Sequence, residues 1–339
     1  MSASTGIPRD RFARPLRDLR LSVTDRCNFR CTYCMPKEIF GRDHPFLPKD
    51  QILTFEELTR LTRIFVGLGV EKVRLTGGEP LLRRGLPTLV AQLREIGGLH
   101  DLTLTTNGSA LIEQAAPLRA AGLSRITISL DALDDAIFRA MNDADFPVHR
   151  VLRGIEAAQT AGFSPIKLNV VVRRSVNESE VLPIARRFAG PEFIVRFIEY
   201  MDVGNSNGWR LDEVVSASEI ATMLDTELSL TPLPSNYLGE VARRYHTSAG
   251  GEVGIISSVS KPFCRDCTRA RLSAEGRLFT CLFAGQGHDL RTPLRAGGTD
   301  DELAAIIRGI WTARDDRYSE LRAAATESQT KVEMSAIGG

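Results

Sequence analysis

A repeated alternation of short apolar runs and longer amphipathic runs constrains the fold of this chain more than any other feature of its sequence. Over the first two thirds, a run with β-strand character is followed six times by a run with helical character. Such strict alternation predicts a parallel sheet whose strands are joined by right-handed helical crossovers. The sheet could be open and doubly wound, or it could curve into a barrel.

The predicted elements can be placed by residue. Several helical runs end at a glycine, the usual stop signal of a helix. The expected strands cover residues 19–24, 72–77, 102–106, 125–130, 166–172 and 193–198. The expected helices cover residues 54–68, 86–96, 110–121, 133–141, 148–161 and 176–188.

Polar residues inside the strands decide between an open sheet and a barrel. Parallel strands that are buried on both faces read as continuous apolar runs, whereas each of these strands alternates apolar and polar side chains. One face of the sheet should therefore pack under the helices while the other lines a lumen. A polar lumen, without the apolar layers of a closed barrel, predicts an incomplete (βα)6 TIM-type barrel that holds a ligand.

Five cations share this predicted polar face: Arg20, Lys72, Arg74, Lys167 and Arg196. The net charge of the whole chain is only +1, so we expect no general attraction to nucleic acid or to a membrane surface. Like charges in one lumen repel one another, and burial increases the cost. These residues therefore predict a polyanionic ligand such as a triphosphate, because Lys and Arg are the usual partners of phosphate oxygens.

The cysteines fall into two compact groups of three. In a long chain without secretory features, tight cysteine groups indicate metal binding rather than disulfides. Three thiolates leave one iron of an iron–sulfur cluster without a protein ligand, and an open metal position is a site for chemistry. A zinc site with its fourth ligand elsewhere is the alternative for each group. The groups are Cys27, Cys31 and Cys34, and Cys264, Cys267 and Cys281, the latter around a predicted hairpin at 274–276.

Two other stretches shape the predicted organisation. Thr76-Gly-Gly-Glu-Pro80 follows the second strand, and its glycines allow the main chain to approach a ligand closely.

Beyond Met201, residues 202–208 are rich in turn formers and the alternation of strands and helices stops. We expect a flexible tail over 1–14, a barrel domain over 15–205, a C-terminal cluster-binding domain over 206–328 and a C-terminal tail over 329–339.

Taken together, the motifs resemble the GTP 3′,8-cyclase family of molybdenum cofactor biosynthesis, among the radical S-adenosylmethionine (SAM) enzymes. The matching segments are C-x3-C-x2-C, Thr-Gly-Gly-Glu-Pro, Leu-Thr-Thr-Asn-Gly, Ser-Leu-Asp, Phe-Ile-Glu-Tyr-Met-Asp, Cys-x2-Cys-Thr-Arg-Ala-Arg and the terminal Gly-Gly. The resemblance implies a lyase that uses SAM and two [4Fe–4S] clusters. Its reaction converts GTP to (8S)-3′,8-cyclo-7,8-dihydroguanosine 5′-triphosphate through a 5′-deoxyadenosyl radical that takes hydrogen from ribose C3′.

The resemblance also implies roles for individual residues. The catalytic residues are Cys27, Cys31, Cys34, Arg269 and Arg271. The SAM contacts are Tyr33, Gly78, Ser129 and Met201, and the clusters are held by the six cysteines. The GTP contacts are Arg20, Arg74, Thr105, Lys167, Arg269, Ala270 and Arg271, with Gly338 and Gly339 reaching into the site. Lys72 and Arg196 are phosphate neighbours by the strand argument.

Partners and alternatives complete the expectations. Family resemblance implies a flavodoxin-type electron donor, a homodimer, and transfer of the product to cyclic pyranopterin monophosphate synthase. Without a long apolar stretch or a signal core, we expect a cytoplasmic protein that binds neither membrane nor nucleic acid. One alternative is a dual-cluster radical enzyme that modifies a peptide, which leaves five inward cations unexplained. The other is a zinc-binding interaction module, which iron and sulfide analysis would distinguish.

Overall fold

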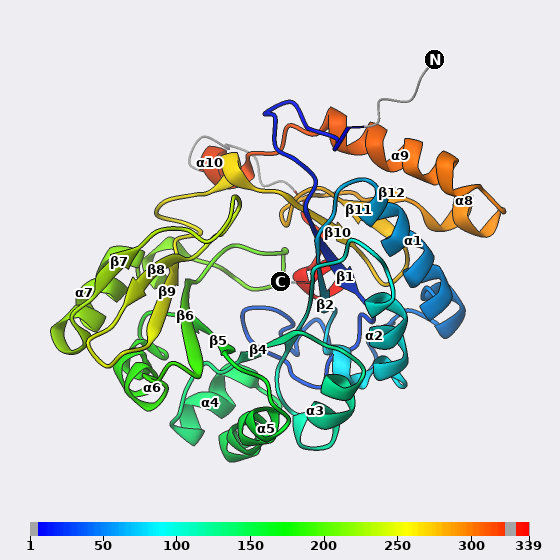
Figure 1. Cartoon of the computed structure of the whole chain (residues 1–339). Helices are drawn as coiled ribbons and strands as arrows, with labels where there is room; N and C mark the ends of the chain where they lie inside the picture. The colour runs from blue at the N-terminus through cyan, green and yellow to red at the C-terminus, as the bar shows by residue number, and fades with distance from the viewer. Residues whose placement is uncertain (1–5, 323–329, 339) are drawn as a thin grey trace.

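A computed structural model of the chain, which describes residues 6–322 and 330–338, is built around one large curved sheet. Within these residues the strand order is β12-β11-β10-β1-β2-β3-β4-β5-β6-β9-β8-β7. The strands from β10 through β1–β6 to β9 run parallel. Figure 1 shows them curving around a central space with helices outside. The predicted incomplete TIM-type barrel is confirmed.

The six predicted β/α units all form. The strands are β1 (Asp18–Ser22), β2 (Lys72–Thr76), β3 (Asp101–Thr106), β4 (Arg125–Ser129), β5 (Ile166–Val172) and β6 (Phe193–Glu199). The helices are α1 (Phe55–Gly67), α2 (Leu86–Arg94), α3 (Leu111–Ala120), α4 (Asp135–Asn142), α5 (Val148–Thr160) and α6 (Val181–Arg187). Only α6 begins clearly later than predicted. The Asn177 side chain before it donates hydrogen bonds to the carbonyls of Asp131 and Val171, which hold this segment against β5.

The C-terminal part extends the same sheet, although its β/α alternation stops as predicted. Strand β9 pairs with β6 and strand β10 pairs with β1, so both exposed edges of the six-stranded sheet are covered. The further strands are β7 (Thr231–Leu233), β8 (Arg243–His246), β9 (Glu252–Ile256), β10 (Arg269–Leu272), β11 (Arg277–Phe279) and β12 (His288–Asp289). The further helices are α7 (Ala217–Leu228), α8 (Arg291–Arg295), α9 (Asp300–Ala313), α10 (Tyr318–Leu321) and α11 (Met334–Ile337).

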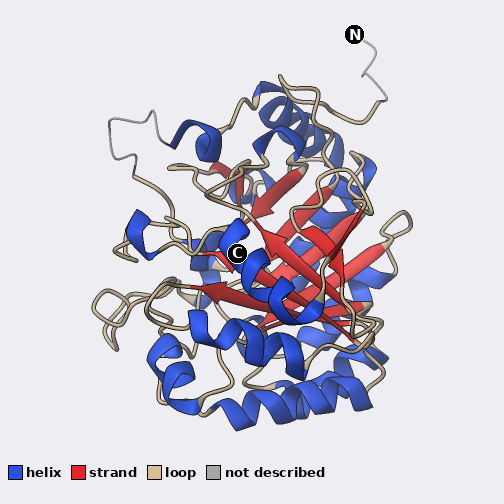
Figure 2. Cartoon of the chain, turned by 90° about the vertical axis from the view of Figure 1, so that its left-hand side faces the viewer, coloured by secondary structure: helices blue, strands red, loops and turns tan. Residues whose placement is uncertain are grey.

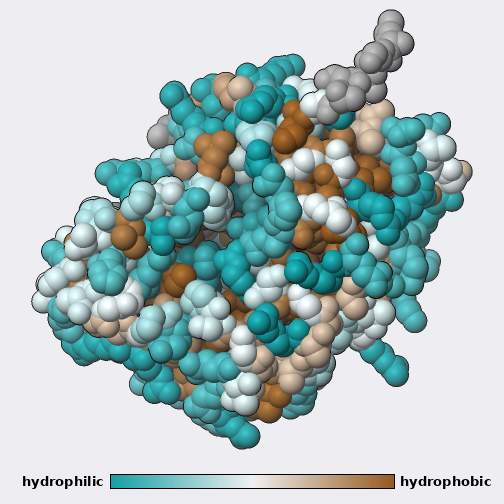
Figure 3. All heavy atoms as spheres, in the orientation of Figure 1, coloured by the Kyte–Doolittle hydropathy of each residue, from teal (hydrophilic) through white to brown (hydrophobic). Residues whose placement is uncertain are grey.

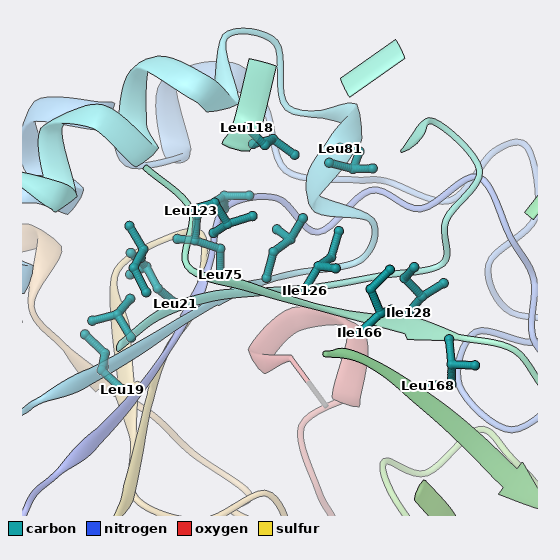
Figure 4. Packing of buried hydrophobic residues seen from close by; sticks show 14 of the residues in the cluster. Leu19, Leu21, Leu75, Leu81, Leu118, Leu123, Ile126, Ile128, Ile166 and Leu168 are labelled. Carbon is teal, nitrogen blue, oxygen red and sulfur yellow. The ribbon is translucent and has the colours of Figure 1, made fainter. Parts of the chain in front are cut away.

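The outer face of the sheet forms the hydrophobic core. The strand register places Leu19, Val73 and Leu102 side by side, and all three are fully buried. Figure 4 shows Leu19, Leu75 and other aliphatic side chains on the outer face of the sheet. Burying each such side chain contributes about 1.5–3 kcal/mol. The apolar half of every strand pattern is thus used in the core, which leaves the polar half for the inner face.

The N-terminal segment is not the flexible tail that we predicted, as far as residues 6–14 are concerned. Asp10 and Arg14 are buried, and the Trp311 indole N–H donates to the Arg14 carbonyl at 3.1 Å. The main-chain N–H of Arg11 donates to the Arg314 carbonyl at 3.1 Å. Buried ion pairs provide the physical reason, because Asp10 pairs with Arg14 inside the segment and also with Arg314, which fixes the segment against the residues after α9. Residues 1–5 lie outside the described residues.

The surface is mostly hydrophilic where Figure 3 shows it, and the C-terminal end lies beside the strands. Among the described helices, none combines the length and the apolar character that crossing a membrane requires. On the face seen in Figure 3, hydrophilic residues cover most of the surface, with smaller groups of hydrophobic residues between them. Figures 1 and 2 both place the C-terminal end near the middle of the molecule, beside the strands.

Candidate active site

The inner face of the sheet lines two adjoining cavities, each of which contains one cysteine group. The first is lined by Cys27, Cys31 and Cys34, and the second by Cys264, Cys267 and Cys281. Both cavities are also lined by Thr105, Asn169, Ile198, Met201 and Leu282. Shared walls make the two cavities one chamber. Two groups that are distant in sequence therefore face the same space.

The first cysteine group lies in the loop that follows β1. Its three residues are free thiols, and burial raises the pKa of Cys27 to about 12 and the pKa of Cys31 well above its ordinary value. A buried thiolate is unfavourable without a positive partner. A bound metal is such a partner, and its charge favours loss of the thiol proton. Three buried thiols that line one cavity and need a positive partner fit an iron–sulfur cluster held by three thiolates.

The second cysteine group lies in a cationic environment. Burial acts to raise the pKa of Cys267, but Arg269 and Arg314 outweigh it and lower this pKa to about 6. The Arg269 Nη2 atom donates to the Cys267 Sγ atom at 3.5 Å. Cys281 differs, because burial raises the pKa of its thiol to about 12. This donor set also fits a cluster with thiolate ligands.

The arrangement of the cysteines does not fit a site for a single metal ion. Within the described ranges, no three His, Cys, Asp or Glu side chains are arranged to hold one metal ion. A four-iron cluster spreads its thiolate ligands more widely than one ion does, so the arrangement is compatible with clusters.

The Gly-Gly loop after β2 supports the first cysteine loop. The N–H of Gly78 donates to the Thr24 carbonyl at 2.9 Å, and the N–H of Glu79 donates to the Arg26 carbonyl at 2.8 Å. A Cβ atom on Gly78 would collide with the Arg26 carbonyl oxygen. The close approach that we predicted toward a ligand is therefore made, in the first place, to the main chain of the cysteine loop. Gly78 nevertheless lines the first cavity.

The other predicted SAM contacts also lie in the first cavity, where Tyr33, Ser129 and Met201 line the wall. The Tyr33 hydroxyl donates to the Asp131 carboxylate at 2.7 Å, and the N–H of Val171 donates to the same carboxylate at 2.9 Å. Burial raises the pKa of Asp131 to about 6. Asp131 thus holds the side chain of Tyr33, a residue that lies between Cys31 and Cys34 in the sequence of the loop.

A row of guanidinium groups crosses the floor of the chamber. The register places Arg271, Arg20 and Arg74 at the same level on β10, β1 and β2. Burial, followed by the charges of Arg74 and Arg271, lowers the pKa of Arg20 well below its ordinary value. Arg74 donates hydrogen bonds to the hydroxyls of Thr105 and Thr127, both at 2.9 Å. Such adjacent cations are stabilised by an anion.

The remaining predicted cations differ in their partners. Arg196 lines the second cavity, and burial together with Arg196 lowers the pKa of Lys167 to about 7. Lys72 lies 3.8 Å from Asp18 and 3.7 Å from Asp101, and its ammonium donates to the Tyr237 hydroxyl. The protein's own carboxylates therefore offset the charge of Lys72. The prediction that Lys72 neighbours a phosphate therefore has less electrostatic support than it has for the other four cations.

Two other predicted contacts have unexpected positions. The Ala270 side chain is fully buried on the outer face beside Leu19, so only its main chain can contact a ligand in the chamber. The Gly338 carbonyl accepts a hydrogen bond from Arg271, and a Cβ atom on Gly338 would collide with Thr76. The C-terminal end thus reaches the chamber. Gly339 lies outside the described residues.

Sequence reasoning missed residues that hold the C-terminal segment in place. The Asp202 carboxylate accepts hydrogen bonds from Tyr318 at 2.6 Å and from Lys331 at 2.8 Å. The N–H of Asn205 donates to the Glu333 carboxylate at 3.0 Å. Asp202 was recognised only as part of a motif, since sequence alone does not show which distant residues pair with it. We call these five residues the C-terminal clamp.

Comparison with known proteins gives a consistent result. Residues 21–188 match the Radical SAM superfamily, and residues 193–320 match the family described as Molybdenum Cofactor Synthesis C. A GTP 3′,8-cyclase from Acidothermus cellulolyticus is 54% identical over 98% of this chain and 99% of its own length. Another from Xanthomonas campestris is 53% identical over 97% of both chains. A third from Staphylococcus haemolyticus is 46% identical over 98% of both.

A solved structure supports the fold. The crystal structure of Streptococcus suis SuiB bound to S-adenosylmethionine matches with a TM-score of 0.60 at 14% identity, covering 86% of this chain and 68% of that chain. At this identity the likeness concerns the fold alone.

Proposed function

Because the chain belongs to the GTP 3′,8-cyclase family of radical SAM enzymes, we propose that its two cysteine groups and the cationic floor between them form the active site. The enzyme is a lyase that converts GTP to (8S)-3′,8-cyclo-7,8-dihydroguanosine 5′-triphosphate, the first step of molybdenum cofactor biosynthesis. The family carries two [4Fe–4S] clusters and uses SAM. One observation carries the assignment of residues, namely that both cysteine groups line one chamber.

The first cavity is proposed as the site of radical formation. Cys27, Cys31 and Cys34 would hold the first cluster, and a cluster with SAM at this place would supply the radical chemistry at ribose C3′. Tyr33, Gly78, Ser129 and Met201 contact SAM and orient it toward the shared wall. Asp131 keeps Tyr33 in place through its hydrogen bond.

The second cavity is proposed as the GTP site. Arg20, Arg74 and Arg271 form the row that would receive the phosphates, and Cys264, Cys267 and Cys281 would hold the second cluster, which would bind the guanine base. At an effective dielectric near 20, a charge pair at about 4 Å is worth roughly 4 kcal/mol before desolvation. Lys167, Arg196, Arg269 and Thr105 complete the proposed GTP contacts, whereas Lys72 contributes less because Asp18 and Asp101 already pair with it.

The C-terminal end closes the chamber in this proposal. Gly338 lies against Thr76, and its carbonyl accepts a hydrogen bond from Arg271. The C-terminal clamp holds the preceding residues near Met201. Excluding water protects a reactive radical from side reactions. The clamp therefore keeps in place a segment that shields the chemistry.

Anaerobic incubation with GTP, SAM and dithionite, followed by product analysis, tests the proposal. We expect the 3′,8-cyclised triphosphate, and we expect none from Cys27→Ser protein. Cleavage of SAM without consumption of GTP would contradict the assignment of the second cavity. The peptide-modifying alternative is disfavoured, because the curated relatives with 46–54% identity carry the cyclase name. Iron and sulfide analysis distinguishes an enzyme with iron–sulfur clusters from a zinc-binding interaction module.

The partners are proposals that rest on family membership alone. We propose a flavodoxin-type electron donor, a homodimer, a cytoplasmic location, and cyclic pyranopterin monophosphate synthase as the enzyme that takes the product. Sedimentation analysis of the holoenzyme tests the dimer.

A further inference from the structure

A cluster of buried charges lies behind the second cysteine group, and it comes from segments to which sequence analysis gave no role. Asp10 and Arg14 belong to the N-terminal segment, and Arg314 follows α9. Their side chains are almost inaccessible, with exposed fractions of 0% for Asp10, 2% for Arg14 and 1% for Arg314. Charged groups are rarely buried to this degree unless they are paired. We call these three residues the rear triad.

The rear triad holds the main chain of the C-x2-C loop. The Arg14 Nη1 atom donates to the Cys264 carbonyl at 2.6 Å, and the Arg314 Nη1 atom donates to the Cys267 carbonyl at 2.8 Å. Arg14 also donates to the Asp316 carbonyl at 2.9 Å. Each guanidinium thus fixes one cysteine of the loop.

The charges of this region do not balance among the buried side chains. The Asp10 carboxylate is shared, since Arg14 Nε donates to it at 2.5 Å and Arg314 Nη1 at 3.1 Å. Arg269 adds a third guanidinium against Cys267. Asp316 also pairs with Arg314, at 3.3 Å, but its side chain is 29% exposed. A buried positive excess is costly without an anion, and a thiolate-bound cluster is such an anion.

One nitrogen of Arg14 has no hydrogen-bond partner within the described ranges. Nε donates to Asp10 and Nη1 donates to two carbonyls, whereas the buried Nη2 atom donates to no protein acceptor there. Arg14 lines the same cavity as Cys264, Cys267 and Cys281. A buried donor without a partner costs about 1–3 kcal/mol. Nη2 is therefore a donor that an occupant of this cavity can satisfy.

We propose that Arg14 is a positioning residue for the second cluster, whose Nη2 atom donates a hydrogen bond to a sulfur atom of that cluster and raises its reduction potential. Hydrogen bonds to sulfur and nearby positive charge both stabilise the more negative, reduced state. Arg314 supports the loop from the other side. The inference rests on the proposed assignment of the second cluster to Cys264, Cys267 and Cys281.

The experiment compares Arg14→Gln with wild type by potentiometric titration of the anaerobic holoenzyme, followed by electron paramagnetic resonance. A Cys264→Ser variant identifies the signal of the first cluster. Arg11→Gln is the matched control, because Arg11 lies in the same segment but pairs at 3.0 Å with Asp315 on the surface, where both are more than 60% exposed. At a fixed potential, we expect the ratio of reduced to oxidised second cluster in Arg14→Gln to fall about tenfold, which corresponds to about 59 mV for one electron. The first cluster and the Arg11→Gln protein should not change.

Other outcomes separate the two proposals. An unchanged potential in Arg14→Gln protein that retains the second cluster overturns the role of Arg14. If Arg14→Gln protein loses the second cluster, Arg14→Lys is measured instead, because lysine keeps the charge beside Asp10 but cannot donate to both carbonyls and a sulfur atom. A lowered potential of the second cluster in Arg14→Lys supports the proposal. A wild-type potential in Arg14→Lys, or loss of the second cluster from both variants, overturns it. Iron for only one cluster in the wild type contradicts the proposed function itself.

Discussion

Lys167 offers the sharpest test of the proposed GTP contacts, because its charge depends on pH near neutrality. Burial, reinforced by Arg196, Arg125 and Arg74, lowers its pKa to about 7. At pH 7.5, only about a quarter of the free protein carries this charge. An anionic ligand favours the charged form, so the pKa of Lys167 rises when GTP binds. Binding should therefore take up about 0.8 proton at this residue at pH 7.5.

The sign of the pH dependence follows from this shift. The bound state holds the proton more tightly than the free state, so GTP affinity is greatest below the free pKa and weakens as pH rises above 7. Between pH 7.5 and pH 8.5 the charged fraction of the free protein falls about eightfold, and the affinity should fall by the same factor.

Isothermal titration calorimetry of GTP in two buffers with different ionisation enthalpies measures both quantities. Lys167→Arg is the control, because arginine stays charged throughout this range and the titration of GTP itself cancels in the comparison. We expect the extra proton and the extra pH dependence in the wild type only. Equal proton uptake in the two proteins would refute the placement of Lys167 beside the nucleotide. Lys167→Ala should weaken GTP binding and retain SAM cleavage.

Three further predictions follow from the site. Cys281→Ser should keep the first cluster and SAM cleavage but lose cyclisation, as iron content and product analysis would show; full activity would remove the second cluster from the mechanism. Lys72→Ala should weaken GTP binding less than Lys167→Ala, because Asp18 and Asp101 already offset its charge; calorimetry that ranks them in the reverse order would contradict this. Asp202→Asn should loosen the C-terminal clamp, so limited proteolysis should cut the last residues several times faster while SAM affinity stays unchanged; wild-type resistance would argue against the clamp.

Local patterns allowed much of the fold to be predicted. The alternation of Leu19, Arg20 and Leu21 determines which side chains enter the core, because successive residues of a strand point to opposite faces. The register of β1 and β2 then brings Arg20 beside Arg74, as the polar-face argument expected. Both cysteine groups were also recognisable, because metal ligands close in sequence have a readable spacing.

Long-range pairing limited the prediction of the site. Lys72 has the same pattern as Arg74, and only the approach of Asp18 and Asp101 shows that its charge is already offset. Arg14 lies in a stretch without strand or helix periodicity, so no local signal connects it with Cys264. The partner of each is set by how distant segments pack.

The sequence by itself determined the β/α units, the apolar and polar faces of each strand, and the presence of two thiol groups. These properties depend on neighbours within a few residues, where side-chain direction follows directly from backbone geometry. Only the tertiary structure decided that β9 and β10 extend the barrel at both edges and that the two cysteine groups share one chamber. It also decided that Arg14 of the N-terminal segment donates a hydrogen bond to the Cys264 carbonyl in the second cysteine group. Such contacts join residues far apart in the chain, and their formation depends on the packing of the whole sheet.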